Sequence, residues 1–211
     1  MSDSGFAQVP GARLAWYADG ADDGIPLVLV HAGVADARMW EPIVPALAAW
    51  YRVVRLDMRG YGRSRSARGS FSPPRDLGAL LDSLGIARAH VIGASFGGLV
   101  ALELAATQPA RVASLVLLAA ALPDIELSAR LLAFAEAEEA AITTGRIGDA
   151  AEVNVRMWAA DSTPTVQGLV AEMQRGAFEL QMREGADSDE LDPPVSARLG
   201  AIGVPVAVAY G

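Results

Sequence analysis

Apolar residues recur along the chain in short continuous runs, and stretches with helical spacing separate these runs. The runs have the length and the valine, leucine and isoleucine content of strands that are buried on both faces of a parallel sheet. They cover residues 26–31, 51–56, 89–94 and 111–121. The stretches with helical spacing cover residues 39–50, 74–84 and 96–108. Strands that alternate with helices in this way predict an α/β fold with a mostly parallel sheet flanked by helices.

The pattern is different at the start of the chain and in its second half. Residues 6–9 and 13–17 are strand-like and surround Pro10-Gly11, which predicts a β-hairpin. From Pro123 to about Leu191 the sequence is rich in alanine and glutamate and keeps helical spacing. This stretch predicts an all-helical insertion.

After the insertion the first pattern resumes, with a helix predicted over residues 194–202 and a strand over 204–210. We therefore expect three segments along the chain. Residues 1–122 form the first part of an α/β core, residues 123–192 form the helical insertion, and residues 193–211 return to the core.

Composition narrows the classes of partner. The chain has 211 residues, is 52% hydrophobic, and contains no cysteine, so it suits one packed unit without disulfides or thiolate metal sites. Its net charge of −8 repels phosphate backbones and anionic lipids, which argues against nucleic acid and membrane partners. Residues 115–122, the longest apolar run, are too short to span a bilayer, and the first residues carry no secretory signal. We expect a cytoplasmic protein.

The strongest chemical motif is Gly93-Ala94-Ser95-Phe96-Gly97, which lies between a predicted strand and a predicted helix. A serine at the centre of G-x-S-x-G in that position is typical of a nucleophile elbow. The turn is so tight that a side chain two positions on either side of the serine would collide with backbone. The serine itself takes a strained backbone conformation that lifts its hydroxyl out of the sheet.

Two further motifs follow predicted strands. His31-Ala32-Gly33-Val34 is similar to a His-Gly-x oxyanion loop, and residues 57–64, Asp-Met-Arg-Gly-Tyr-Gly-Arg-Ser, are similar to a D-x-R-G-x-G-x-S loop. With the elbow, these motifs resemble the α/β-hydrolase family over essentially the whole chain. The resemblance implies the fold predicted above, with residues 123–192 in the position of the family's helical cap. It gives Asp57 and Arg59 a role in fixing the loop.

The resemblance also implies acyl-transfer chemistry. Ser95 would attack the carbonyl carbon of a small apolar ester or lactone and form an acyl-enzyme, without a cofactor or metal. The negative charge on the carbonyl oxygen would be met by the backbone N–H groups of Phe96 and Gly33, with Val34 as an alternative to Gly33. Val34 and, from the cap, Trp158 are candidates for the substrate pocket. Carbon–carbon hydrolysis by a relative of this type stays open.

Ser95 needs an acid and a histidine as catalytic partners, and the sequence does not supply them at the family's positions. In the family, an acid and then a histidine follow the serine, but both histidines of this chain, His31 and His90, precede Ser95. His90 opens the strand before the elbow, about 16 Å from its end. Some relatives carry the acid one strand earlier, after the strand that corresponds to residues 111–121, and there Asp124 is the candidate. We therefore expect the family's final strand and helix, with its acid and histidine, to be absent from these 211 residues.

Three interpretations follow. The chain is the front part of a serine hydrolase and is inactive or weakly active by itself. Alternatively, it is a non-catalytic small-molecule binding module, in which the oxyanion hole and binding alone remain. A third interpretation is an incomplete fragment whose residues 204–210 leave a long apolar edge open to aggregation.

Overall fold

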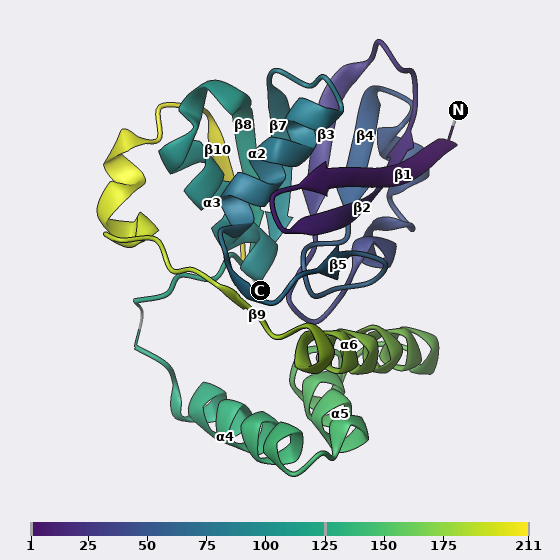
Figure 1. Ribbon diagram of the computed structural model, residues 1–211, viewed down its shortest axis with the longest axis vertical. Helices are drawn as coiled ribbons and strands as arrows, with labels where there is room; N and C mark the ends of the chain where they lie inside the picture. The colour runs from purple at the N-terminus through teal and green to yellow at the C-terminus, as the bar shows by residue number, and fades with distance from the viewer. Residues whose placement is uncertain (1, 125, 211) are drawn as a thin grey trace.

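The computed structural model describes residues 2–124 and 126–210; Met1, Ile125 and Gly211 lie outside the described residues, so the outer limits of the first and third predicted segments are not described. The main sheet has the strand order β1-β2-β4-β3-β7-β8-β10, and β5 (Arg65–Ser66) pairs with β2. Its strands are β1 (Ser2–Val9), β2 (Ala12–Asp19), β3 (Ile25–Val30), β4 (Tyr51–Leu56), β7 (Ala89–Ala94), β8 (Val112–Leu118) and β10 (Val206–Ala209). The β1-β2 hairpin and the β2-β4 pair are antiparallel, and the other neighbours on this path are parallel. The mostly parallel sheet is therefore confirmed (Figure 1).

Strand β3 lies at the centre of this sheet and supplies both hydrophobic cores. Val28 and Val30 belong to the core under α2 (Pro73–Ser83) and α3 (Phe96–Thr107). Leu27 and Leu29 belong to the core on the opposite face, with residues of a 3-10 helix (Ala37–Trp40) and of α1 (Val44–Leu47). Because alternate side chains of a strand point to opposite faces, a continuous apolar run suits this doubly covered position.

The helix predicted over residues 39–50 is wrong in its continuity. Trp40 and Val44 are buried as expected, but the segment forms the 3-10 helix and the one-turn α1 with a break between them. Pro42 and Pro45 lack an N–H and favour a helix start over a helix interior, which accounts for the break. Trp50, the last residue of the predicted helix, lies beyond α1 and is 80% exposed.

Helices α4 (Ala129–Thr143), α5 (Ile147–Trp158) and α6 (Pro164–Glu184) form a separate group at one end of the sheet (Figure 1). We call them the cap helices. The side chains of Ser128 and Thr163 cap α4 and α6 by accepting hydrogen bonds from backbone N–H groups in the first turn. Ala141, Ala150 and Phe178 form a small core of their own.

The sequence predicted an all-helical insertion, but the structure places a short strand in it. β9 (Ala186–Ser188) pairs in parallel with β6 (Gly69–Phe71), so two short strands link the end of the cap helices to the loop that follows β5. The segment was missed because a three-residue strand carries no periodicity of its own. The helix predicted over 194–202 is a 3-10 helix (Val195–Ala201). No helix in the described residues is both long and apolar enough to cross a bilayer.

Polar contacts hold α6 against the core along its length. Arg38 forms an ion pair with Glu172 at 2.7 Å, the backbone N–H of Ser66 donates to Glu184 at 2.9 Å, and the Gln181 amide donates to the carbonyl of Gly60 at 3.3 Å. These contacts place α6 beside the loop of residues 57–64.

The far edge of the sheet is open within the described residues. β10 bonds to β8 on one side and has no described strand on the other. All four residues of β10 are exposed, and Val208 is 63% exposed. On the face opposite α3, Ile92 and Leu118 are only partly buried, because the 3-10 helix and α1 cover the β3-β4 half of that face.

Candidate functional site

The nucleophile elbow joins the end of β7 to the start of α3. Ser95 has φ 48° and ψ −116°, a left-handed conformation that costs a residue with a side chain about 1–3 kcal/mol. Backbone hydrogen bonds enforce it: the N–H of Ser95 donates to Leu118 at 2.9 Å, and its carbonyl accepts from Ala121 at 3.0 Å. The strain is therefore fixed by the neighbouring strand β8 and the residues just after it.

Glycines permit this turn because backbone packs against backbone on both sides of Ser95. A Cβ added to Gly93 would lie 2.7 Å from the Cα of Gly98, and one added to Gly97 would overlap the carbonyl oxygens of Val30 and His31. The first turn of α3 thus lies directly on the end of β3. The steric reason predicted for both glycines is therefore the one that the structure has.

The candidate oxyanion residues lie together in front of the elbow. A Cβ added to Gly33 would be 3.5 Å from the Cβ of Phe96, so the loop after β3 approaches the first residue of α3. As that first residue, Phe96 has an N–H without a partner inside the helix. The side chain of Val34 packs against the core on the other face of the sheet, and its backbone N–H stays the alternative to that of Gly33.

His31 is bound on both ring nitrogens and is fully buried. Its Nδ1 donates to the carbonyl of Ala32 at 2.8 Å, and its Nε2 accepts from the N–H of Met58 at 3.0 Å. Burial lowers the pKa of His31 below 6.5, which keeps the ring neutral. His31 therefore joins the loop after β3 to the loop of residues 57–64.

His90 lies near the start of β7, at the opposite end of that strand from the elbow. Its Nδ1 is bonded to the hydroxyl of Ser114 on β8 at 2.7 Å. Within the described residues, neither histidine is hydrogen-bonded to Ser95.

The loop of residues 57–64 is fixed by Asp57 and Arg59. The carboxylate of Asp57 accepts from the N–H groups of Ala37 and Arg63 at 3.0 and 2.8 Å. The Arg59 guanidinium forms a buried ion pair with Asp76, 2.8 Å on each of two bonds, and also donates to backbone carbonyls of the β1-β2 turn. These contacts are structural in kind, as the resemblance implied.

Tyr61 is a site residue that the sequence analysis did not select. Its hydroxyl lies 3.6 Å from where a Cβ of Gly33 would be, and its ring packs edge-on against His31, with centroids 4.9 Å apart. Burial raises the pKa of Tyr61 to about 12, against the effect of a hydrogen bond with Gln181 of α6. The phenol therefore stays protonated and can donate. The sequence does place Tyr61 between two glycines, Gly60 and Gly62, and both have positive φ in the structure. These flanking glycines are the signal by which Tyr61 could have been selected.

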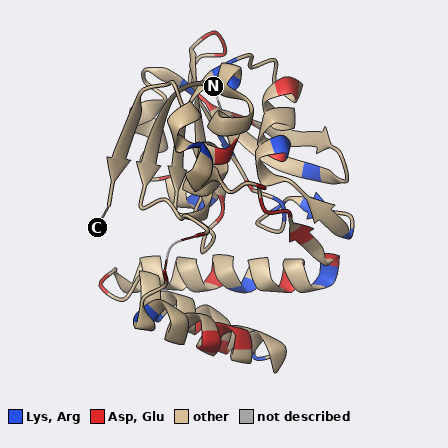
Figure 2. Ribbon diagram, turned by 90° about the vertical axis from the view of Figure 1, so that its left-hand side faces the viewer, with Lys and Arg blue, Asp and Glu red and all other residues tan. Residues whose placement is uncertain are grey.

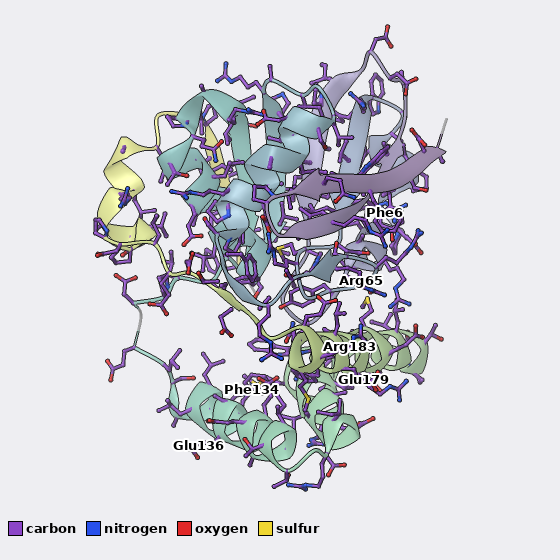
Figure 3. The ribbon with its side chains drawn as sticks, viewed as in Figure 1. Phe6, Arg65, Phe134, Glu136, Glu179 and Arg183 are labelled. Atoms are coloured by element: carbon purple, nitrogen blue, oxygen red, sulfur yellow. The ribbon has the colours of Figure 1, made fainter. Side chains whose placement is uncertain are left out.

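The remaining candidates make contacts elsewhere. Asp124 accepts a hydrogen bond from the hydroxyl of Ser196 in the last 3-10 helix. Trp158 is half-exposed at the end of α5 and packs edge-on against Phe134 of α4, with centroids 5.5 Å apart. Figure 3 shows Phe134 on the side of α4 that faces the rest of the molecule and Glu136 on the outer side.

Comparison with known proteins places this geometry in context. Residues 25–174 match the family model described as the alpha/beta hydrolase fold. A dihydrolipoyllysine-residue acetyltransferase component of an acetoin cleaving system from Pseudomonas putida is 47% identical over 118 residues, covering 54% of this chain and 32% of that protein. 3-oxoadipate enol-lactonase 1 from Acinetobacter baylyi is 36% identical over 107 residues, covering 50% of this chain and 40% of that protein. The chain thus matches well under half the length of these relatives.

A solved structure covers far more of the chain. The enol-lactonase from Burkholderia xenovorans superposes with a TM-score of 0.77 at 26% sequence identity. The match covers 97% of this chain and 80% of that one. The similarity therefore extends over the core and the cap helices alike.

Gly97→Ala should destabilise the chain strongly, because its Cβ would overlap two backbone carbonyls at the end of β3. We expect a loss of about 3 kcal/mol or more in the free energy of unfolding. Gly168→Ala is the matched control: Gly168 lies inside α6 with nothing within 4 Å of the added Cβ, so we expect a gain of about 0.5–1 kcal/mol. Urea unfolding followed by circular dichroism measures both, and an equal effect at the two positions would contradict the steric argument.

His31→Gln should change how stability depends on pH. Because the folded-state pKa of His31 lies below its ordinary value of 6.5, the unfolded chain binds the extra proton in acid. The stabilisation by neutral His31 is complete above pH 6.5 and declines by up to about 1.4 kcal/mol per pH unit below it. We expect the stability difference between wild type and His31→Gln to shrink steadily as the pH falls from 7 to 5.

Urea titrations across this pH range provide the measurement. His90→Gln is the control for loss of an imidazole as such, since His90 lies outside the loop network. A difference between wild type and His31→Gln that stays constant with pH would show that His31 is not held neutral by the fold.

Proposed function

The chain belongs to the α/β-hydrolase family, and we propose that within it the chain carries the nucleophilic part of a serine hydrolase for small apolar carboxylic esters or lactones. The observation that carries the proposal is Ser95 at φ 48°, raised between the end of β7 and α3 beside the convergent Gly33 and Phe96. A strained serine next to preorganised backbone donors is the arrangement that acyl transfer requires.

In the first step the hydroxyl oxygen of Ser95 bonds to the carbonyl carbon and its proton passes to a base. The bond from that carbon to the alkoxy oxygen then breaks, and the base gives the proton to the leaving alcohol, which leaves an acyl-enzyme. The N–H groups of Phe96 and Gly33 meet the charge on the carbonyl oxygen. Water then attacks the acyl-enzyme and releases the acid. No cofactor takes part in this sequence.

A cavity beside Phe96 offers an aromatic surface for the apolar part of a substrate. It measures about 400 Å3; the rings of Tyr61, Phe71 and Phe96 line one part of it, and Arg59, Gln181, Glu184 and Asp187 make the rest largely polar. Pockets for small molecules are largely apolar with a few placed polar groups, and protonated Tyr61 next to Gly33 is such a group. In this proposal residues 123–192 act as the cap over Ser95, and Val34 and Trp158 remain candidate pocket residues.

We propose that the general base for Ser95 lies outside the described residues. His31 and His90 are each bonded away from Ser95, and Asp124 is bonded to Ser196. We propose that an acid and a histidine follow the described chain and that their segment covers the open side of β10 and the partly buried Ile92 and Leu118. Without them, only the oxyanion donors and substrate binding contribute, so activity is weak or absent.

A non-catalytic binding module is the second candidate function, and the bonding of both histidines away from Ser95 favours it. In that case the cavity at Phe96 and Tyr61 binds a small molecule without acyl transfer. For either function we propose a cytoplasmic protein without nucleic acid or membrane partners, because its net charge of −8 repels phosphate surfaces.

Incubation with p-nitrophenyl acetate tests the catalytic proposal. We expect the chain to become acetylated once, slowly, at Ser95, and the Ser95→Ala variant to remain unmodified, as measured by intact mass and peptide mapping. Ser70→Ala, which removes an exposed serine on β6, is the control and should react as the wild type does. Equal modification of wild type and Ser95→Ala would contradict the catalytic proposal and favour the binding module.

The origin of the base has a separate test. We expect the coding sequence beyond Gly211 to contain an aspartate or glutamate followed by a histidine. Expression of that longer chain should raise ester hydrolysis about 100-fold or more, since a positioned general base contributes about 10²–10⁴-fold. A stop codon at that position, or a longer chain of unchanged activity, would reject the placement of the base.

A further inference from the structure

Glu103 is a buried carboxyl group that the proposed chemistry does not use. It lies in the middle of α3 with 6% of its surface exposed. Its side chain forms no hydrogen bond or ion pair with another described residue. Burying a carboxylate without a partner costs free energy, so such a position calls for an explanation in terms of what the group faces.

The carboxyl group of Glu103 lines a cavity of about 420 Å3 between α3 and the segment that follows β9. Four further carboxylates line the same cavity: Asp124, Asp189, Glu190 and Asp192. The rest of the wall is largely apolar and includes Phe96, Leu99 and Leu191. Figure 2 shows acidic residues, in red, along the segment that runs between α6 and the core.

Within the described residues, none of these five carboxylates forms an ion pair; Arg198 lies beside Asp192 but donates to the backbone carbonyls of Asp192 and Pro193. Burial is the cause that raises the pKa of Glu103 to about 7, and no positively charged side chain acts on it in the opposite direction. Arg75 lines only the adjoining cavity, which shares Glu103, Asp189 and Glu190. Asp124 accepts a hydrogen bond from Ser196, which is neutral.

The arrangement does not suit a metal ion. Within residues 2–124 and 126–210, no three or more histidine, aspartate or glutamate side chains are close enough together to hold one. Both walls of the cavity carry carboxylates and apolar side chains: Glu103 lies on α3 with Phe96 and Leu99, and Leu191 lies between Glu190 and Asp192 on the facing segment. This mixture suits a small ligand with one charged end and an apolar part. A primary ammonium on a short alkyl chain has that shape and charge.

We propose that the cavity at Glu103 binds a small organic monocation, whose ammonium group pairs with the Glu103 carboxylate while its alkyl part packs against Phe96, Leu99 and Leu191. The carboxylates of Asp189, Glu190 and Asp192 at the mouth attract the cation. The proposal stands apart from the acyl-transfer function, because it concerns binding at α3 and requires no reaction at Ser95.

Binding of the cation must be linked to the ionisation of Glu103. A cation pairs with the ionised carboxylate and not with the protonated one, so affinity rises as the pH passes upward through the pKa of about 7. Between pH 6 and pH 8 the ionised fraction of a group with that pKa increases about tenfold. The association constant for the cation should increase by the same factor.

Isothermal titration with n-butylammonium chloride, and with n-butanol as the neutral isostere, tests this. We expect n-butylammonium to bind the wild type with about tenfold higher affinity at pH 8 than at pH 6, and n-butanol to bind weakly and without pH dependence. Glu103→Gln should lose most of the n-butylammonium affinity at pH 8. Circular dichroism establishes that this variant is folded.

Two further variants keep the outcome decisive. Asp189→Asn with Glu190→Gln removes charge from an exposed segment and should weaken binding several-fold while keeping the pH dependence. Glu152→Gln removes one exposed carboxylate on α5 and should leave binding unchanged. Absence of n-butylammonium binding, equal binding of n-butanol, or equal loss of affinity in Glu152→Gln and Glu103→Gln would each overturn the proposal.

Discussion

The close approach of α3 to the end of β3 is the constraint on which the rest of the structure depends. It is a contact between backbones, made where Gly97 lies against the carbonyls of Val30 and His31. Because no side chain separates them, the first N–H groups of α3 lie next to the loop that leaves β3. Ser95 keeps its positive φ through backbone hydrogen bonds to Leu118 of β8 and to Ala121 just after it. The glycine contact and these two bonds together place the serine beside the first N–H groups of α3.

The loops in front of this contact are held by polar groups that face away from Ser95. His31 bonds to the backbone of Met58, Asp57 bonds to that of Ala37 and Arg63, and Arg59 pairs with Asp76. Each of these side chains is buried and satisfied, which rigidifies a loop that would otherwise be mobile. Gln181 of α6 bonds to Gly60 in the same loop. The loop of residues 57–64 therefore contacts both α6 and the loop that follows β3.

Local sequence patterns predicted those parts of the molecule that depend on local physics. The apolar run in β3 predicts burial on both faces, and the glycines around Ser95 predict the elbow, because in both cases the residue itself limits the backbone. The break between Trp40 and Val44 was also encoded, in Pro42 and Pro45, but helical spacing outweighed it in the prediction. Gly60 and Gly62 mark a tight loop around Tyr61, but the contact of Tyr61 with Gln181 and the β6-β9 pair could not be predicted in this way, since each joins segments more than a hundred residues apart.

Two buried titratable groups give the fold opposing responses to pH. Neutral His31 loses its stabilising effect as the pH falls below 6.5, since the unfolded chain then binds the extra proton. Glu103 behaves in the opposite sense: with a pKa raised from 4.5 to about 7, its protonated form stabilises the fold below pH 4.5, and that effect is lost as the pH rises to 7. Between pH 4.5 and pH 6.5 the two groups change the free energy of unfolding in opposite directions as the pH rises. The wild type can therefore show a nearly flat dependence of stability on pH even though both groups contribute. A cation at Glu103 would remove one of these contributions, because it stabilises the ionised form that burial disfavours.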